Sequence, residues 1–236
     1  MATYLRISEE QEPESERIAR EALLKHLRPQ DALLSGVRFH DYREGDIEID
    51  LLVLMPDAGI AVVEVKGGRV SFANGKWWTT GKGDPAQIDP VGQARRGLHA
   101  LRRFLKDQPE WEWGKLPGDW YLCFPFTDVP QGRDMGPEGQ RATIFAQGEE
   151  EQLARGIYDM LLSRPGKSLP AADWVQEVID ILQAQGAEPI TLEQRVVQRL
   201  DAIEELTAEQ ATMIKVWRNN RFIEVVGGAG SGKTWL

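Results

Sequence analysis

Residues 47–66 read IEIDLLVLMPDAGIAVVEVK, and this stretch decides the fold. It holds two runs rich in Ile, Leu and Val, and the turn residues PDAG at 56–59 separate them. Such runs predict neighbouring strands, here over residues 46–55 and 59–65. A further apolar run at residues 32–40 precedes them, so we expect an antiparallel meander of three strands.

Acidic side chains interrupt both apolar runs. Because side chains alternate between the faces of a strand, Asp50 is predicted to share a face with Glu48 and Leu52, away from Ile49, Leu51 and Val53. By the same rule, Glu64 and Lys66 project together from the end of the next strand. Carboxylates in so apolar a setting are costly unless they are paired or bind a cation.

The pair of Asp50 and Glu64 has the chemistry of a magnesium site, since Mg²⁺ is commonly held by one or two carboxylates plus waters and substrate phosphate. A metal and Lys66 together could supply a water nucleophile and positive charge beside a phosphate. The residues therefore predict a metal-dependent phosphodiesterase site. Taken alone, an ion pair between Lys66 and Glu64 or Asp50 without catalysis explains them as well.

Helical patterns flank this core. Residues 12–28 place Ala19, Leu23 and Leu27 at helical spacing before Pro29, and Asp89 followed by a proline predicts the start of a helix that runs to about residue 106. The dipeptide at 74–75, Asn-Gly, favours a tight hairpin. We also expect strands at 119–126 and 142–146, and helices at 149–162 and 171–185.

Four ordered motifs resemble the nuclease-related domain (NERD) family of the PD-(D/E)xK restriction-endonuclease-like superfamily. They are Glu16, IDLL at 49–52, GIAVVEVKG at 59–67 and DPVGQA at 89–94, and the resemblance covers residues 10 to 130 or so. It implies an α/β fold with a restriction-endonuclease-like core, a mixed central sheet flanked by helices, over a domain at 10–165.

The resemblance also implies roles for particular residues. Asp50 and Glu64 would ligate Mg²⁺ or Mn²⁺, Lys66 would position or activate the attacking water, and Glu16 and Gln93 would line the same site. The chain departs from the family pattern at Asp89 and Gly67, where Asn is the usual residue, and neither position is a proposed ligand.

Helical periodicity also predicts where the side chains of Glu16 and Gln93 point. Glu16 lies almost over Leu23 on the apolar face of its helix, although the preference of acids for helix N-termini explains it equally well. Gln93 shares a side of its helix with Gly97 and Leu101, so we expect it to point inward, with an internal hydrogen bond as the alternative.

The net charge of −9 argues against coating of nucleic acid by bulk electrostatics, so contact with DNA needs a local patch. The helix at 90–106 offers a basic stripe that could follow a phosphate backbone, and a solvated helix face explains the same stripe. Its residues are Arg95, Arg96, Arg102, Arg103 and Lys106.

The sequence GGAGSGKT at 227–234 satisfies the phosphate-loop pattern and follows a strand-like run at 222–226. In a working site, main-chain amides cradle phosphate, the lysine reaches its outer oxygens and the threonine ligates Mg²⁺. The predicted nucleotide-binding residues here are Gly227, Gly230, Gly232, Lys233 and Thr234.

Upstream, LTAEQ at 206–210 resembles the Q motif of Rep/UvrD-like superfamily 1 helicases, which implies that Gln210 reads adenine. We therefore expect a helical linker at 166–205 and an incomplete P-loop segment at 206–236, the N-terminal fragment of a helicase domain. ATP would bind only in a longer chain that carries the helicase in cis.

A single cysteine, Cys123, excludes an intramolecular disulfide, and no apolar run approaches the roughly 18 residues that span a membrane. We expect a soluble, cytoplasmic protein. The leading hypothesis is a Mg²⁺- or Mn²⁺-dependent DNA nuclease at the start of a nuclease–helicase. A noncatalytic DNA-binding or assembly module that targets the helicase, and a nucleotide-binding protein, are the alternatives.

Overall fold

The computed structural model describes residues 2–8, 10–81, 84–132, 134–136, 138–163 and 173–187. Met1–Glu188 form one compact unit. The predicted nucleotide-binding residues, including Gln210 and Lys233, lie outside the described residues, as does the whole segment at 206–236.

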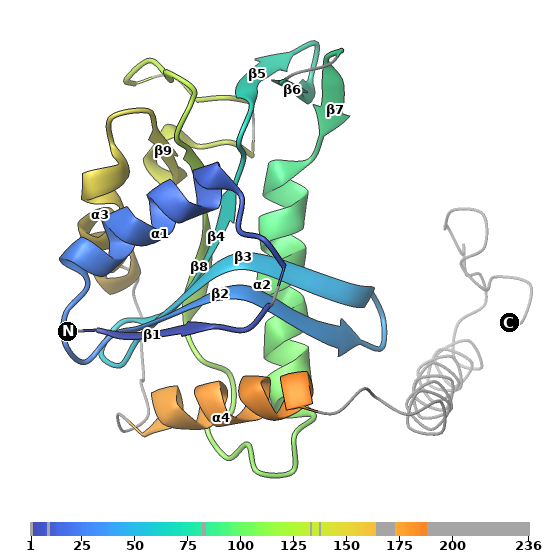
Figure 1. Ribbon diagram of the computed structural model, residues 1–236, viewed down its shortest axis with the longest axis vertical. Helices are drawn as coiled ribbons and strands as arrows, with labels where there is room; N and C mark the ends of the chain where they lie inside the picture. The colour runs from blue at the N-terminus through green and yellow to red at the C-terminus, as the bar shows by residue number, and fades with distance from the viewer. Residues whose placement is uncertain are drawn as a thin grey trace, which may run out of the picture. The chain divides into compact units, whose positions relative to one another are not determined.

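A mixed sheet of six strands forms the centre of this unit (Figure 1). Its strands stand in the order β1, β2, β3, β4, β8 and β9. The strands β2, β3 and β4 pair antiparallel, which is the predicted meander, while β1 pairs parallel with β2 and the pairs β4–β8 and β8–β9 are also parallel. Their bounds are Thr3–Arg6, Ala32–Asp41, Gly45–Met55, Gly59–Val65, Gly118–Phe124 and Ile144–Ala146.

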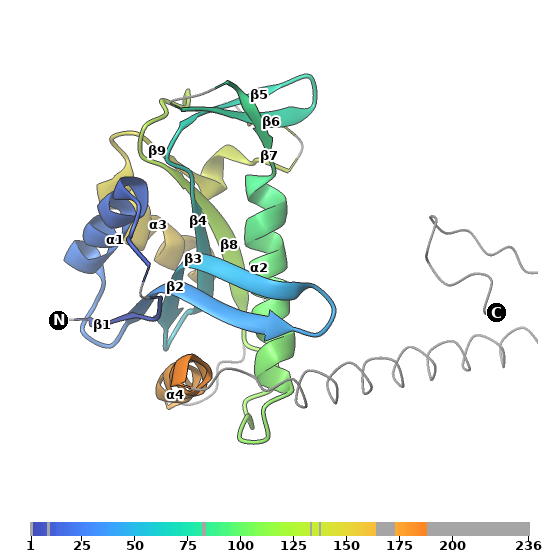
Figure 2. The same ribbon diagram turned by 45° about the vertical axis from the view of Figure 1, so that its right-hand side comes forward.

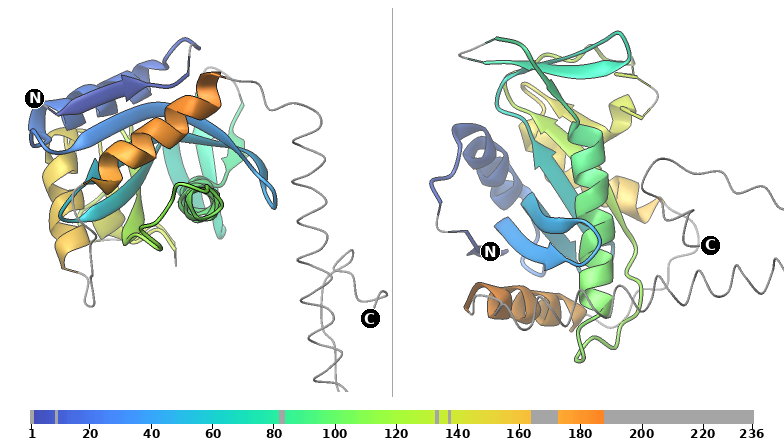
Figure 3. Two further views of the ribbon diagram at one scale, coloured as in Figure 1. Left: turned by 90° about the horizontal axis from the view of Figure 1, so that it is seen from below. Right: turned by 90° about the vertical axis from the view of Figure 1, so that its right-hand side faces the viewer.

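Four helices cover the two faces of the sheet (Figures 1 and 3). The helices α1 (Glu14–His26) and α3 (Leu153–Leu162) pack on one face, and α2 (Pro90–Lys106) and α4 (Trp174–Ala187) pack on the other. A fold of mixed α/β type with a central sheet between helices is the class that the sequence predicted.

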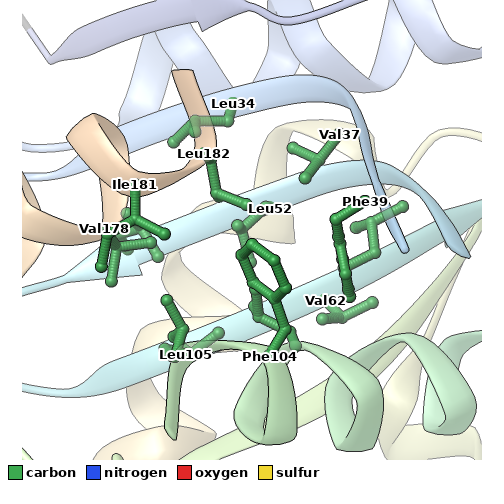
Figure 4. Packing of buried hydrophobic residues seen from close by; sticks show 14 of the residues in the cluster. Leu34, Val37, Phe39, Leu52, Val62, Phe104, Leu105, Val178, Ile181 and Leu182 are labelled. Atoms are coloured by element: carbon green, nitrogen blue, oxygen red, sulfur yellow. The ribbon is translucent and has the colours of Figure 1, made fainter. Parts of the chain in front are cut away.

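Side chains from β2, β3, β4, α2 and α4 meet in a buried cluster on the second face (Figure 4). In this cluster, Leu52 and Val62 from the sheet pack with Phe104 from α2 and Leu182 from α4. All of these except Phe104 are at most 1% exposed. Because α4 contributes to this core, part of the stretch expected as a linker packs within the compact unit.

The helix α2 begins as its sequence predicts. Asp89 accepts a hydrogen bond from the amide of Gly92 at 2.9 Å, and Pro90 occupies the first helical position. The cap fixes the start of the helix, whose first turns lie beside the first half of β3 and the end of β4, where the candidate site is found.

A separate antiparallel sheet joins β4 to α2 and lies beside the N-terminal end of α2 (Figure 2). It contains β5 (Arg69–Ala73), β6 (Lys76–Thr80) and β7 (Ala86–Ile88). Asn74 and Gly75 both have positive φ, as a two-residue hairpin turn requires. Two short 3₁₀ helices, Arg141–Thr143 and Glu150–Gln152, complete the described elements.

None of the helices in the described ranges combines the length and the apolar character that crossing a bilayer would need.

Candidate active site

The ladder between β3 and β4 stops at Leu51 and Val63. Two residues beyond Val63, the amide of Val65 donates to Oδ2 of Asp50 at 2.7 Å. The carboxylate of Asp50 thus replaces the main-chain acceptor that continued pairing of β3 with β4 would have supplied. The next amide, that of Lys66, donates across to β8. The two strands therefore separate at Asp50, while β4 remains attached to the sheet through β8.

At Asp50 the side chains of β3 also change the face of the sheet to which they point. Ile49 and Leu52 both pack on the side of α2 and α4, whereas Leu51 packs on the side of α1 and α3. The predicted alternation placed Ile49 and Leu51 on the same face of the sheet, so it is wrong across Asp50. Opposite Asp50 in β2, Gly36 has φ +60°, a left-handed conformation that departs from regular strand geometry.

In β4 the alternation holds to the end of the strand. Val62 packs on the side of α2, and Val63 and Val65 pack on the side of α1. Glu64 is 5% exposed, and Nζ of Lys66 lies 2.6 Å from its Oε1. The lysine side chain is 21% exposed, so a buried carboxylate is joined to a cation that solvent can reach.

A polar cavity of about 300 Å³ opens at this point. It is lined by residues of β3, of α2 and of the end of β4, namely Asp46, Ile47, Glu48, Asp50, Glu64, Lys66, Gln93, Arg96 and Gly97. Gly97 lets α2 approach β3, since a Cβ there would lie 3.2 Å from Cγ1 of Ile49.

Gln93 lines the cavity but is exposed, so the expectation that it points inward is corrected. The inward-facing residues of this part of α2 are Val91, Gly92 and Ala94, which are buried, so Gln93 lies on the solvent side of the helix. Asp46 and Glu48 are further lining residues that sequence reasoning did not select. The signal for them was present, since they precede Asp50 at two-residue spacing.

Glu16 reaches the same region from α1, where it is partly buried. Gly67 permits the approach, since a Cβ at this position would lie 2.7 Å from Oγ of Ser15. Glu16 lines a neighbouring hollow of about 90 Å³, and Glu48 lines both this hollow and the main cavity. Burial, followed by the negative charges of Asp50 and Glu48, raises the pKa of Glu16 to about 7.

The carboxylates of Asp50 and Glu64 are difficult to ionise together. Burial raises the pKa of Asp50, against the opposing effects of the Val65 amide and Lys66. Burial and then the charge of Asp50 raise the pKa of Glu64 to about 7, although Lys66 opposes the shift. One lysine thus faces two crowded carboxylates, a donor set that a divalent cation would stabilise in its ionised form.

Within the described ranges, no three or more His, Cys, Asp or Glu side chains gather around one position for a metal. Two carboxylates completed by waters and a phosphate oxygen are a common arrangement for Mg²⁺. Asp50 and Glu64 fit that arrangement in residue type, in burial and in their shared cavity.

The basic stripe of α2 divides into two parts. Arg103 binds both oxygens of Asp41, at 2.9 and 3.0 Å, and the Asp41 side chain is 1% exposed. Nη2 of Arg102 donates to the carbonyls of Leu116 and Gly118. These two arginines hold the β2–β3 hairpin and the loop before β8 against α2.

The N-terminal part of the stripe faces solvent. Arg95 pairs with Glu138 at 3.1 Å and Arg96 pairs with Asp89 at 3.3 Å, and both arginine side chains are 47% exposed. Only Arg96 among the five basic residues lines the cavity. Lys106, at the far end of α2, is exposed.

The part of the chain that contains this cavity matches a known protein family. Residues 12–124 match the model of the nuclease-related domain, NERD. No curated protein and no solved structure matched the chain. The matched range contains every residue that lines the cavity, as well as Glu16.

Proposed function

We propose that the nuclease-related domain at residues 12–124 hydrolyses phosphodiester bonds in DNA, with Mg²⁺ or Mn²⁺ held by Asp50 and Glu64. The observation that carries the proposal is the convergence of Asp50, Glu64 and Lys66 on one cavity, at the point where β3 and β4 separate. A structural ion pair would not require an open, polar cavity over the buried carboxylate of Glu64 and the half-buried carboxylate of Asp50.

A divalent cation at these carboxylates would lower the pKa of a bound water and offset the charge of the phosphate. The chain's own residues prepare the site for it. The Val65 amide fixes Asp50 through Oδ2, and Oδ1 takes part in no hydrogen bond within the described residues. Glu64 is held by Lys66, so both carboxylates are oriented before a ligand arrives.

Lys66 has three N–H donors, and its hydrogen bond to Glu64 uses one of them. The others can donate to the attacking water or to a phosphate oxygen that enters the cavity. Glu16, with a pKa of about 7, exchanges its proton near neutral pH, and we assign its carboxylate the uptake of the proton that the attacking water gives up.

The experiment is a cleavage assay on circular and linear DNA with Mg²⁺, with Mn²⁺ and with a chelator. Asp50→Ala and Lys66→Ala should each abolish metal-dependent cutting. Asp159→Ala, which removes an exposed carboxylate from α3 on the other face of the sheet, is the matched control and should cut like the parent. We would abandon the proposal if Asp50→Ala cut as fast as the parent.

A second candidate is a noncatalytic module that binds DNA and targets a helicase. The exposed guanidinium groups of Arg95 and Arg96 favour it, because they could bind phosphate without any metal. DNA binding that needs no metal and survives Lys66→Ala, with no cleavage under any condition, would support this candidate over the nuclease.

We also propose, from sequence alone, that residues 206–236 begin an ATP-dependent superfamily 1 helicase domain that acts in cis with the nuclease. The proposal rests on the phosphate-loop pattern at 227–234 and on Gln210. ATP titration of a longer chain should show binding that Lys233→Ala removes. Retention of ATP affinity in that variant would contradict the assignment.

A further inference from the structure

The walls of the cavity carry opposite charges. On the β3 side, Asp46 and Glu48 line it with side chains that are 89% and 56% exposed. On the α2 side stands Arg96, with Arg95 one residue before it on the exposed part of the helix. The proposed metal ligands and Lys66 lie between these walls.

The acidic wall keeps a net negative charge. Arg38 pairs with Glu48 at 2.9 Å, but it also binds both oxygens of Glu10, at 2.7 and 2.8 Å. Two carboxylates, Glu48 and Glu10, therefore share one guanidinium group. Asp46 stands on the same wall, where its Oδ1 lies 2.8 Å from Nδ1 of His40.

The arginines of the basic wall can leave their present partners and bind a phosphate. Arg95 and Arg96 are paired with Glu138 and Asp89, but both pairs are exposed to solvent, where such pairs are weak. Asp89 also caps α2 through the Gly92 amide, so it stays in place when a guanidinium group turns toward a phosphate.

From this asymmetry we propose that the site takes single-stranded DNA, with its phosphates along Arg95, Arg96 and Lys66 and its bases toward Asp46 and Glu48. The inference rests on the proposed nuclease function and specifies its substrate. A duplex carries a second backbone across a groove of about 6 or 12 Å. With one backbone at the metal ligands, the second would face the acidic wall at close range.

The acidic wall suits unpaired bases for a separate reason. Carboxylates accept hydrogen bonds from amino groups on bases, such as N4 of cytosine. In a single strand both hydrogens of such an amino group are free to make these bonds, whereas in a duplex the partner base takes one of them and only the hydrogen that faces the groove remains. The same two side chains, Asp46 and Glu48, thus repel a second strand and can bind the bases of the first.

The test measures binding separately from cleavage. Fluorescence anisotropy with Ca²⁺ compares a labelled 20-nucleotide single strand with the hairpin duplex of the same sequence, for the parent and for Asp46→Asn/Glu48→Gln. The control, Glu21→Gln/Asp159→Asn, makes the same change in net charge on α1 and α3, on the other face of the sheet. Cleavage of both substrates is then followed with Mg²⁺.

We expect the parent to bind the single strand at least tenfold more tightly than the duplex. Asp46→Asn/Glu48→Gln should reduce this ratio to threefold or less by improving duplex binding, and the control should leave the ratio as in the parent. Arg95→Gln/Arg96→Gln should weaken single-strand binding about tenfold and reduce the slope of log K against log salt by about 0.7 for each phosphate that the variant no longer neutralises.

Equal affinity of the parent for both substrates would overturn the inference, as would an unchanged ratio in Asp46→Asn/Glu48→Gln or an equal shift in the control. If both substrates are cut equally and the cutting depends on Asp50, the proposed nuclease function stands and its strand preference is refuted. A strand preference in binding without any cleavage would support the inference and refute the nuclease.

Discussion

The main-chain amide of Val65 donates to Oδ2 of Asp50 at 2.7 Å, at the point where β3 and β4 no longer pair. The bond satisfies an amide that the separated strands would leave without a main-chain partner. It also aims a carboxylate into the gap between the strands. The break in the sheet and the candidate metal site are thus one structural feature.

Asp50→Asn should abolish metal binding and preserve the fold, because Asn can still accept the Val65 hydrogen bond and removes a charge that burial makes costly. Without metal, the variant should unfold at the temperature of the parent or above it. Mg²⁺ at 100 times its Kd should raise the Tm of the parent by about 5–10 °C, from about 2.7 kcal/mol of linkage, and leave that of the variant unchanged. Differential scanning fluorimetry measures both effects, and equal metal shifts would refute Asp50 as a ligand.

The stability of the metal-free protein should fall as pH rises from about 5 to 8. In the folded state the pKa of Glu64 is about 7, above its ordinary value near 4.5, so between these values the folded state holds more protons than the unfolded state. Glu16 contributes with the same sign. Urea unfolding at several pH values should give a smaller slope for Glu64→Gln and a still smaller slope for Glu16→Gln/Glu64→Gln across this window.

Metal-dependent cleavage should change with pH in the opposite direction. A cation binds the ionised carboxylates, so protonation of Glu64 competes with it, and the rate at subsaturating Mg²⁺ should rise through pH 7. High Mg²⁺ should move the midpoint to lower pH. A midpoint that does not depend on the metal concentration would contradict competition between proton and metal at this carboxylate.

Lys66→Met should lower stability by about 2–4 kcal/mol at pH 8, because it leaves Glu64 buried and charged without its cation. At pH 5, where Glu64 is protonated, the loss should be much smaller. Lys66→Met/Glu64→Gln should recover most of the stability and still cut no DNA. Urea unfolding of the single and double variants separates the two roles, and a loss at pH 5 as large as at pH 8 would show that packing rather than charge is responsible.

Arg103→Met should destabilise the protein by about 2–4 kcal/mol, because Asp41 would remain buried without the guanidinium group that binds both its oxygens. Lys106→Met, which removes an exposed cation from the same helix, should change stability by no more than about 0.5 kcal/mol. If thermal unfolding ranked the two variants equally, Arg103 would belong to a solvated stripe rather than to the support of the β2–β3 hairpin.

Local signals made much of the fold predictable. The Asp89-Pro90 start of α2 and the Asn74-Gly75 turn are confirmed, because each depends on the backbone preferences of a few adjacent residues. The meander of β2, β3 and β4 is confirmed for a similar reason, since short turns leave antiparallel neighbours as the simplest pairing. The strand β1 was not predicted, because its four residues depend on a parallel pairing with the distant β2.

The site was only partly accessible from sequence. Alternation correctly grouped Glu64 with Lys66, but it failed across Asp50, where separation from β4 and the conformation of Gly36 change the facing of β3. The basic stripe looked uniform in sequence, because helical spacing cannot show that Arg103 meets a buried carboxylate on another element.

By itself, the sequence determined most of the strands and helices, the two carboxylates with their lysine, and the family resemblance of residues 10–130, all of which depend on residue type and short spacing. Only the tertiary structure decided that β3 leaves β4 at Asp50, that Glu48 and Arg96 form opposite walls of one cavity, and that α1 brings Glu16 beside it. The physical reason is that these relations join residues of β3, β4, α2 and α1, and packing across the sheet rather than local conformation sets their distances.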